Sequence, residues 1–110
     1  MKFIALLSIF FVSSAFAQKQ NVSCKVTYNV ETILENNISV TNEDIKFGTF
    51  EAFSFHIKQT ANNKTELQIS NMDEPARSYA SAELREINDN IQLSIWTKFY
   101  IIEANCKLIK

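Results

Sequence analysis

Two cysteines near opposite ends of the chain constrain its fold more than any other feature. Cys24 and Cys106 each fall on the apolar side of a run of alternating apolar and polar residues. In a β-strand such alternation sends one set of side chains to the buried face, so we expect both thiols to point into the core. A disulfide between them closes a loop of about 82 residues, which stabilises the fold by roughly 4–5 kcal/mol in the chain-entropy model. For a small domain this is a large share of the total stability.

The start of the chain has the features of a cleaved signal peptide. Residues 1–17 contain a lysine at position 2, an apolar stretch, and small residues at Ala15 and Ala17, the two positions that a signal peptidase recognises before the cleavage site. A transmembrane span needs about 20 apolar residues, and this stretch is about half as long. We therefore expect a secreted or periplasmic protein that begins at Gln18, in which residues 18–110 form one β-rich domain. Export also favours a disulfide over a metal-binding cysteine pair.

The charge balance argues against a nucleic-acid partner. The leader contains one of the 11 Lys and Arg residues, which leaves 10 against 12 Asp and Glu. The lysines are scattered singly, and the two arginines, Arg77 and Arg85, lie among glutamates. Binding to phosphates needs a clustered basic face. No later segment is long enough to span a bilayer, so we expect no stable membrane insertion, and the partner is an unknown protein or small ligand.

Alternating patterns predict strands through the first two thirds of the domain. The clearest is the run over residues 22–34, which alternates without interruption. In the run over 47–59, Phe50 falls out of phase with Phe53, and a bulge near Glu51 and Ala52 would bring the phenylalanine rings inside. We also expect a polar turn region over 36–44 with a short strand at 38–40, a turn at 61–63, a strand over 64–70 that buries Leu67 and Ile69, and hence a hairpin over 53–70.

The last fifth of the chain, residues 90–110, alternates in two phases. Ile91, Leu93 and Ile95 share one face, and from Ile102 onward the apolar positions change parity. One added residue near positions 100–102 explains the change, either as a β-bulge or as a strand that passes from one sheet to another. Because the run is about three times the usual strand length, we expect it to bend, or to break near residues 104–105.

Residues 73–88 allow two interpretations. Their apolar residues fit helical spacing over 74–87, with Pro75 as a helix start, but residues 78–85 also alternate as a strand does. Asn88-Asp89-Asn90 suits a hairpin turn, which favours the strand. The strand interpretation predicts an all-β fold, a small antiparallel meander closed as a sandwich or barrel. The alternative is an α+β fold with a helix at 74–87.

The chain offers little for catalysis, so we expect it not to be an enzyme. His56 is the only histidine, and we expect it to be solvated or locally hydrogen-bonded. A Ser-His-acid triad would have to use it, and no serine lies in a Gly-x-Ser-x-Gly elbow. Glu51 and Glu103 are the carboxylates that could form a hydrolytic pair, but their phase in the alternating pattern favours positions at the rim or in the lining of a barrel. Phosphate-binding loops need glycines and zinc sites need several ligands, so we expect neither metal nor cofactor.

Trp96, Lys98 and Tyr100 form the candidate partner contact. They lie on one face of the last run, and Trp and Tyr dominate interaction hot spots. The competing interpretation buries this face in the core, and it is the one we expect for Trp96, because Ile102, Ala104 and Cys106 share its parity. Asn-x-Ser/Thr sequons occur at Asn21, Asn37 and Asn63, the last two in expected loops; they matter only in a eukaryotic secretory route.

These features predict a non-catalytic binding or accessory protein, with a secreted inhibitor of an envelope-directed or host hydrolase as the alternative. The expected architecture resembles that of the small periplasmic lysozyme inhibitors. Their Ser-Gly-x-x-Tyr type loop has no counterpart, because Gly48 is the only glycine.

Overall fold

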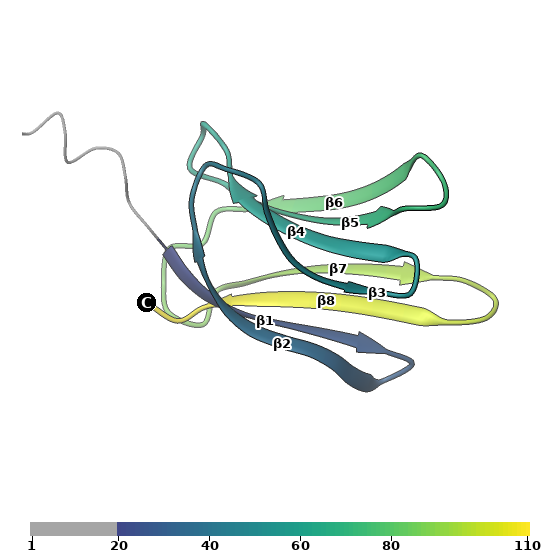
Figure 1. Ribbon diagram of the computed structural model, residues 1–110. Helices are drawn as coiled ribbons and strands as arrows, with labels where there is room; N and C mark the ends of the chain where they lie inside the picture. The colour runs from purple at the N-terminus through teal and green to yellow at the C-terminus, as the bar shows by residue number, and fades with distance from the viewer. Residues whose placement is uncertain (1–19) are drawn as a thin grey trace, which may run out of the picture.

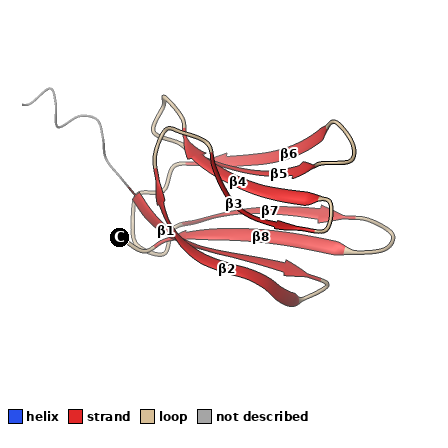
Figure 2. Ribbon diagram, in the orientation of Figure 1, coloured by secondary structure: helices blue, strands red, loops and turns tan. Residues whose placement is uncertain are grey.

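The computed structural model describes residues 20–110, which fold into two four-stranded antiparallel sheets packed face to face (Figure 1). The signal peptide expected over 1–17 and the start at Gln18 lie outside the described residues. Residues 20–110 contain strands and no helix (Figure 2), so the all-β prediction is confirmed and the helix at 74–87 is wrong. The strands are β1 (Gln20–Tyr28), β2 (Glu31–Val40), β3 (Ile45–Phe50), β4 (Phe53–Gln59), β5 (Thr65–Asn71), β6 (Ala76–Ala82), β7 (Asn90–Trp96) and β8 (Ile101–Leu108).

The first and last strands lie side by side in the middle of one sheet. Sheet A has the order β2-β1-β8-β7, and sheet B has the order β3-β4-β5-β6. Cys24 and Cys106 are directly opposite each other on β1 and β8, and they form the predicted disulfide. The bond therefore joins the two ends of the chain within sheet A. Both cysteines are fully buried among the apolar side chains between the sheets.

The strand predicted over 22–34 is wrong, because the chain reverses within it. Residues 29 and 30 form the turn between β1 and β2, and Tyr28 pairs with Glu31. A two-residue turn shifts the parity of the inward-facing positions by one. A bulge in β2, where Val26 pairs with Leu34 and Thr27 with Thr32, shifts it back. Beyond the bulge, even-numbered residues of β2 such as Leu34 face inward as they do on β1, so the apolar positions of the sequence keep the same parity on both sides of the turn.

The predicted bulge near Glu51 is also wrong, and the reason is similar. Glu51 and Ala52 form the turn between β3 and β4, and Phe50 pairs with Phe53. Glu51 has a φ of 57°. The turn shifts the parity as a bulge would, so Phe50 and Phe53 face the same side. The irregularity in β3 lies instead at Phe47, whose ring packs 6.2 Å from that of Phe55.

The last run is broken by a turn between Trp96 and Ile101, so neither the single bent strand nor a break at 104–105 is correct. β7 and β8 form a hairpin in which Ile95 pairs with Ile102. The Asn88-Asp89-Asn90 segment forms no hairpin turn, since it carries the chain from β6 in sheet B to β7 in sheet A. The strand over residues 64–70, its buried Leu67 and Ile69, and the β4–β5 hairpin are confirmed.

Candidate functional site

Four of the five hairpin turns lie at one end of the sandwich. The turns β1–β2, β3–β4, β5–β6 and β7–β8 are on the right in Figure 1, and the longer β2–β3, β4–β5 and β6–β7 connections are at the other end. We call this the turn end. Side chains from both sheets meet there, so it is the place where residues distant in sequence form one surface.

Four aromatic rings beneath the turns hold the two sheets together at this end. The ring centroids of Tyr28 and Phe50 are 5.0 Å apart, those of Tyr28 and Tyr100 are 5.6 Å apart, and those of Phe53 and Tyr100 are 5.7 Å apart. Tyr28 and Tyr100 come from the sheet A side of the sandwich, and Phe50 and Phe53 come from sheet B. Aromatic contacts of this kind contribute about 0.5–1.5 kcal/mol each beyond the area they bury. These contacts fix the positions of the strand ends that carry the turns.

Hydrogen bonds from backbone amides also connect neighbouring turns. The Asn29 amide donates to the carbonyl of Ile101 at 2.8 Å, and the Ile101 amide donates to the side-chain oxygen of Asn29 at 2.8 Å. In sheet B the Met72 amide donates to the carbonyl of Ala52 at 2.7 Å. Each pair of adjacent turns is therefore fixed, and the turn end has a defined shape.

Large apolar side chains are exposed at the turn end. Trp96 is 71% exposed and Phe99 is 81% exposed. Val30, on the β1–β2 turn, and Met72, on the β5–β6 turn, are exposed as well. Scattered apolar residues are normal on a protein surface, but a group of aromatic side chains at one end of a domain is typical of an interaction site. We call Trp96, Lys98 and Phe99 the aromatic loop.

The expectation that Trp96 belongs to the core is wrong. It rested on a shared parity between Trp96 and Ile102, and the β7–β8 turn separates the two residues. Trp96 pairs with Ile101 and shares the outer face of β7 with Gln92 and Ser94. Lys98 is exposed in the turn, whereas Tyr100 is half-buried against Tyr28 and Phe53. Of the three residues proposed from sequence, Trp96 and Lys98 are therefore on the surface and Tyr100 is an anchor.

Phe99 is the residue that sequence reasoning missed, because alternation placed it on the buried face with Ile95. It sits in a turn organised by Thr97. The Thr97 hydroxyl accepts hydrogen bonds from the amides of Phe99 at 3.1 Å and Tyr100 at 3.0 Å, and the Thr97 amide donates to the carbonyl of Tyr100 at 2.9 Å. Threonine favours local turns of this kind, so Thr97 is the residue of the sequence that could have indicated a turn here. The result is an ordered loop that presents Phe99 to solvent.

His56 connects two polar side chains on the outer face of sheet B. Its Nδ1 lies 2.9 Å from Oδ2 of Asp44, and its Nε2 lies 2.9 Å from Oγ of Ser54. The hydrogen-bond order is that of a Ser-His-Asp triad. However, Ser54 is only 4% exposed, whereas the nucleophile of a triad has to contact its substrate. The arrangement ties the β2–β3 loop to β4, in agreement with the local bonding expected for His56.

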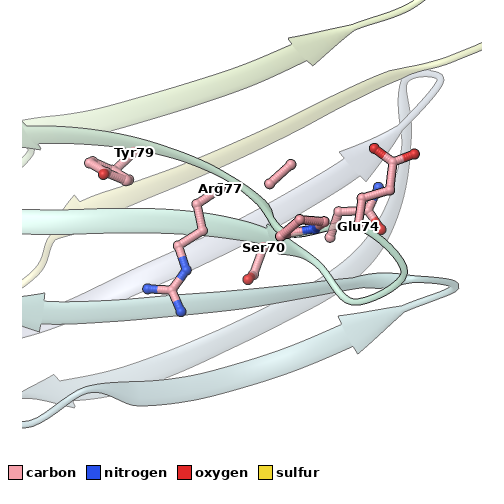
Figure 3. A pocket seen from close by; sticks show the side chains of 7 residues that line it. Ser70, Glu74, Arg77 and Tyr79 are labelled. Atoms are coloured by element: carbon pink, nitrogen blue, oxygen red, sulfur yellow. The ribbon is translucent and has the colours of Figure 1, made fainter.

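A shallow pocket of about 530 Å³ lies over the β5–β6 hairpin (Figure 3). Glu74 and Arg77 supply its charges, and Figure 3 shows the Arg77 guanidinium pointing away from the Glu74 carboxylate. The lining is polar and largely exposed, with no hydrophobic enclosure for a small ligand. The residues that line it are Ser70, Asn71, Glu74, Pro75, Ala76, Arg77 and Tyr79.

The other sequence candidates are spread over the fold. Glu51 lies in the β3–β4 turn of sheet B, whereas Glu103 lies on the outer face of β8 in sheet A. Asn63 is in the β4–β5 turn as expected, but Asn37 is on β2, because this strand extends to Val40. Within residues 20–110, no three His, Cys, Asp or Glu side chains gather as a metal site would require. In the same part of the chain, no helix has the length and apolar character to cross a membrane.

Comparison of the chain with protein-family models, curated proteins and solved structures found no match.

Proposed function

We propose that this chain is a non-catalytic binding protein that contacts a protein partner through its turn end. The exposed Trp96 and Phe99 carry the proposal. Large, rigid aromatic side chains provide much contact area for little loss of conformational entropy, and they are enriched among interface hot spots. The hydrogen bonds of Thr97 hold the loop in one conformation, so binding does not have to order it. Lys98 adds a positive charge that favours a partner with an acidic rim.

The chain would act outside the cytoplasm. The Cys24–Cys106 disulfide is compatible with an extracellular or periplasmic location, where such bonds persist. The leader-like residues 1–17 support the same location. In that setting a domain of this size gains a large part of its stability from the disulfide, and it can present the aromatic loop on a rigid sheet.

The second candidate is an inhibitor of an envelope-directed or host hydrolase. The observation that favours it is the position of Phe99, which lies in the turn of a hairpin, at 81% exposure. A side chain presented in this way can enter the substrate cleft of an enzyme, as the P1 residues of inhibitors enter specificity pockets. Both candidates use the same loop and differ in whether the partner loses activity on binding.

Capture with the oxidised domain, residues 18–110, tests the proposal. The immobilised wild-type protein and three alanine variants, at Phe99, Trp96 and Tyr79, are exposed to the extracellular or periplasmic fraction of the source cells, and captured proteins are identified by mass spectrometry. Phe99→Ala removes the exposed ring of the aromatic loop. Tyr79→Ala is the matched control, because Tyr79 is also an exposed aromatic residue, at 61%, but lies in the middle of β6.

We expect at least one protein to be captured by the wild type and by Tyr79→Ala, and to be lost with Phe99→Ala. Purified partner would then be tested for hydrolase activity with and without the domain, which separates the two candidates. Capture that survives both Phe99→Ala and Trp96→Ala would contradict a binding role for the aromatic loop.

A further inference from the structure

Strand β7 forms a free edge of sheet A. Its register with β8 is set by two bonds beyond its ends: the Thr97 amide donates to the Tyr100 carbonyl at 2.9 Å, and the Leu108 amide donates to the Asp89 carbonyl at 2.8 Å. In an antiparallel ladder the residues that face the neighbouring strand alternate, so the odd-numbered residues of β7 bond to β8. The backbone groups of the even-numbered residues point away from β8. Within residues 20–110, no other strand pairs with this edge.

The edge of β7 lacks the features that prevent edge-to-edge pairing. Edge strands are usually protected by charged side chains, proline or bulges. Among the edges of the two sheets, β2 contains two glutamates and a bulge, β3 contains Lys46 and a bulge, and β6 contains Arg77. β7 reads Asn-Ile-Gln-Leu-Ser-Ile-Trp, with no charge, and its register with β8 is regular over its whole length.

We propose that a second copy of this chain pairs with β7 in antiparallel fashion, so that sheet A continues through a two-fold axis. The register that uses every free backbone group places Leu93 opposite Leu93 of the second copy. Gln92 then exchanges two hydrogen bonds with Ser94 of the second copy, and Asn90 does so with Trp96. No charged residue meets a like charge in this pairing, which is the condition that self-association of one strand must satisfy.

The side chains of β7 fit this register on both faces. On the inner face Leu93 and Ile95 are only half-buried in the isolated chain, and they would be covered by Leu93 and Ile91 of the second copy. On the outer face Gln92 lies opposite Ser94 of the second copy, and the ring of Trp96 lies opposite the smaller side chain of Asn90. Lys98 and Phe99 lie in the loop beyond the strand, so both stay exposed in each copy and the two loops point in opposite directions, whereas Trp96 becomes part of the paired strand.

A charge-swap pair tests both the association and its register. Gln92→Lys combined with Ser94→Lys places lysine opposite lysine of the second copy on both sides of the axis. The matched variant, Gln92→Lys combined with Ser94→Glu, places lysine opposite glutamate of the second copy at the same positions. Both substituted side chains are exposed, so neither variant disturbs the core. Sedimentation velocity of the oxidised proteins over a range of micromolar concentrations gives the mass of each.

We expect the wild type and the Gln92→Lys, Ser94→Glu variant (Lys/Glu) to sediment as dimers at high concentration. The dimer dissociation constant of the Gln92→Lys, Ser94→Lys variant (Lys/Lys) should be at least about tenfold higher than that of the wild type. High salt should weaken the Lys/Glu dimer. A wild type that stays monomeric overturns the proposal, and so does a dimer that both variants leave unchanged. The test is independent of the turn-end function, because Phe99→Ala should keep the dimer and the Lys/Lys variant should keep the captured partner.

Discussion

The β1–β2 turn carries a strained residue whose replacement should stabilise the protein. Asn29 and Val30 have φ angles of 50° and 65°, as a two-residue type I′ turn requires, and the preferred sequence for such a turn is Asn-Gly. A side chain branched at Cβ makes this conformation costly, by about 1–2 kcal/mol. Val30 is 91% exposed, so removing its side chain loses almost no packing.

Val30→Gly should therefore raise the free energy of unfolding by about 1 kcal/mol, after the roughly 0.5–1 kcal/mol that the greater freedom of glycine in the unfolded chain subtracts. In urea, with an m-value of about 1–2 kcal/mol/M, the midpoint should rise by about 0.5–1 M. Val30→Ala is the control, since it keeps Cβ and should gain less than half as much. An unchanged or lower urea midpoint for Val30→Gly at the same m-value would refute the left-handed backbone conformation of Val30.

Three further substitutions test other parts of the fold. Cys106→Ser should lower the free energy of unfolding by about 3–5 kcal/mol, and equal denaturant midpoints for oxidised and reduced wild type would contradict this. Gly48→Ala would place a Cβ 2.5 Å from Cδ1 of Leu34, so it should cost about 1–3 kcal/mol in the wild type and almost nothing beside Leu34→Ala; equal costs in both backgrounds would show that Leu34 is not the obstacle. Backbone amides of Glu86 and Arg85 donate to Asp89 and lower the pKa of its carboxyl, so this group stabilises the fold above its ordinary pKa and the benefit is lost as the pH falls. Asp89→Asn should accordingly flatten the dependence of thermal stability on pH between about pH 5 and pH 2, and an unchanged slope would argue against these bonds.

Sequence patterns revealed the inward and outward faces better than the positions where the chain reverses. The disulfide, the hairpin of β4 and β5 and the all-β class all follow from parity and turn residues. A two-residue turn and a one-residue bulge both shift the parity of a strand by one, so they look alike in sequence. The alternation near Glu51 therefore predicts a bulge where the chain turns, and the alternation over residues 22–34 predicts no turn because the bulge in β2 cancels the shift made by residues 29–30.

The same ambiguity decided what could be predicted of the candidate site. Residue types point to Trp96 and Lys98, but a single continuous strand over residues 90–110 would place Trp96 in the core and Phe99 on the buried face. Only the hairpin places both on the surface. The meeting of four turns at one end could not be read from the sequence, because it depends on how two sheets pack.

Fluorescence of Trp96, the only tryptophan, tests most directly whether the aromatic loop is a surface. The measurement is best made on the Gln92→Lys, Ser94→Lys variant at low concentration, so that pairing along β7 does not cover the ring. We expect the folded protein to emit at long wavelength, close to the emission of the unfolded chain in urea, and acrylamide to quench both forms to a similar degree. A blue-shifted emission that acrylamide does not reach would place Trp96 in the core and contradict the turn-end surface.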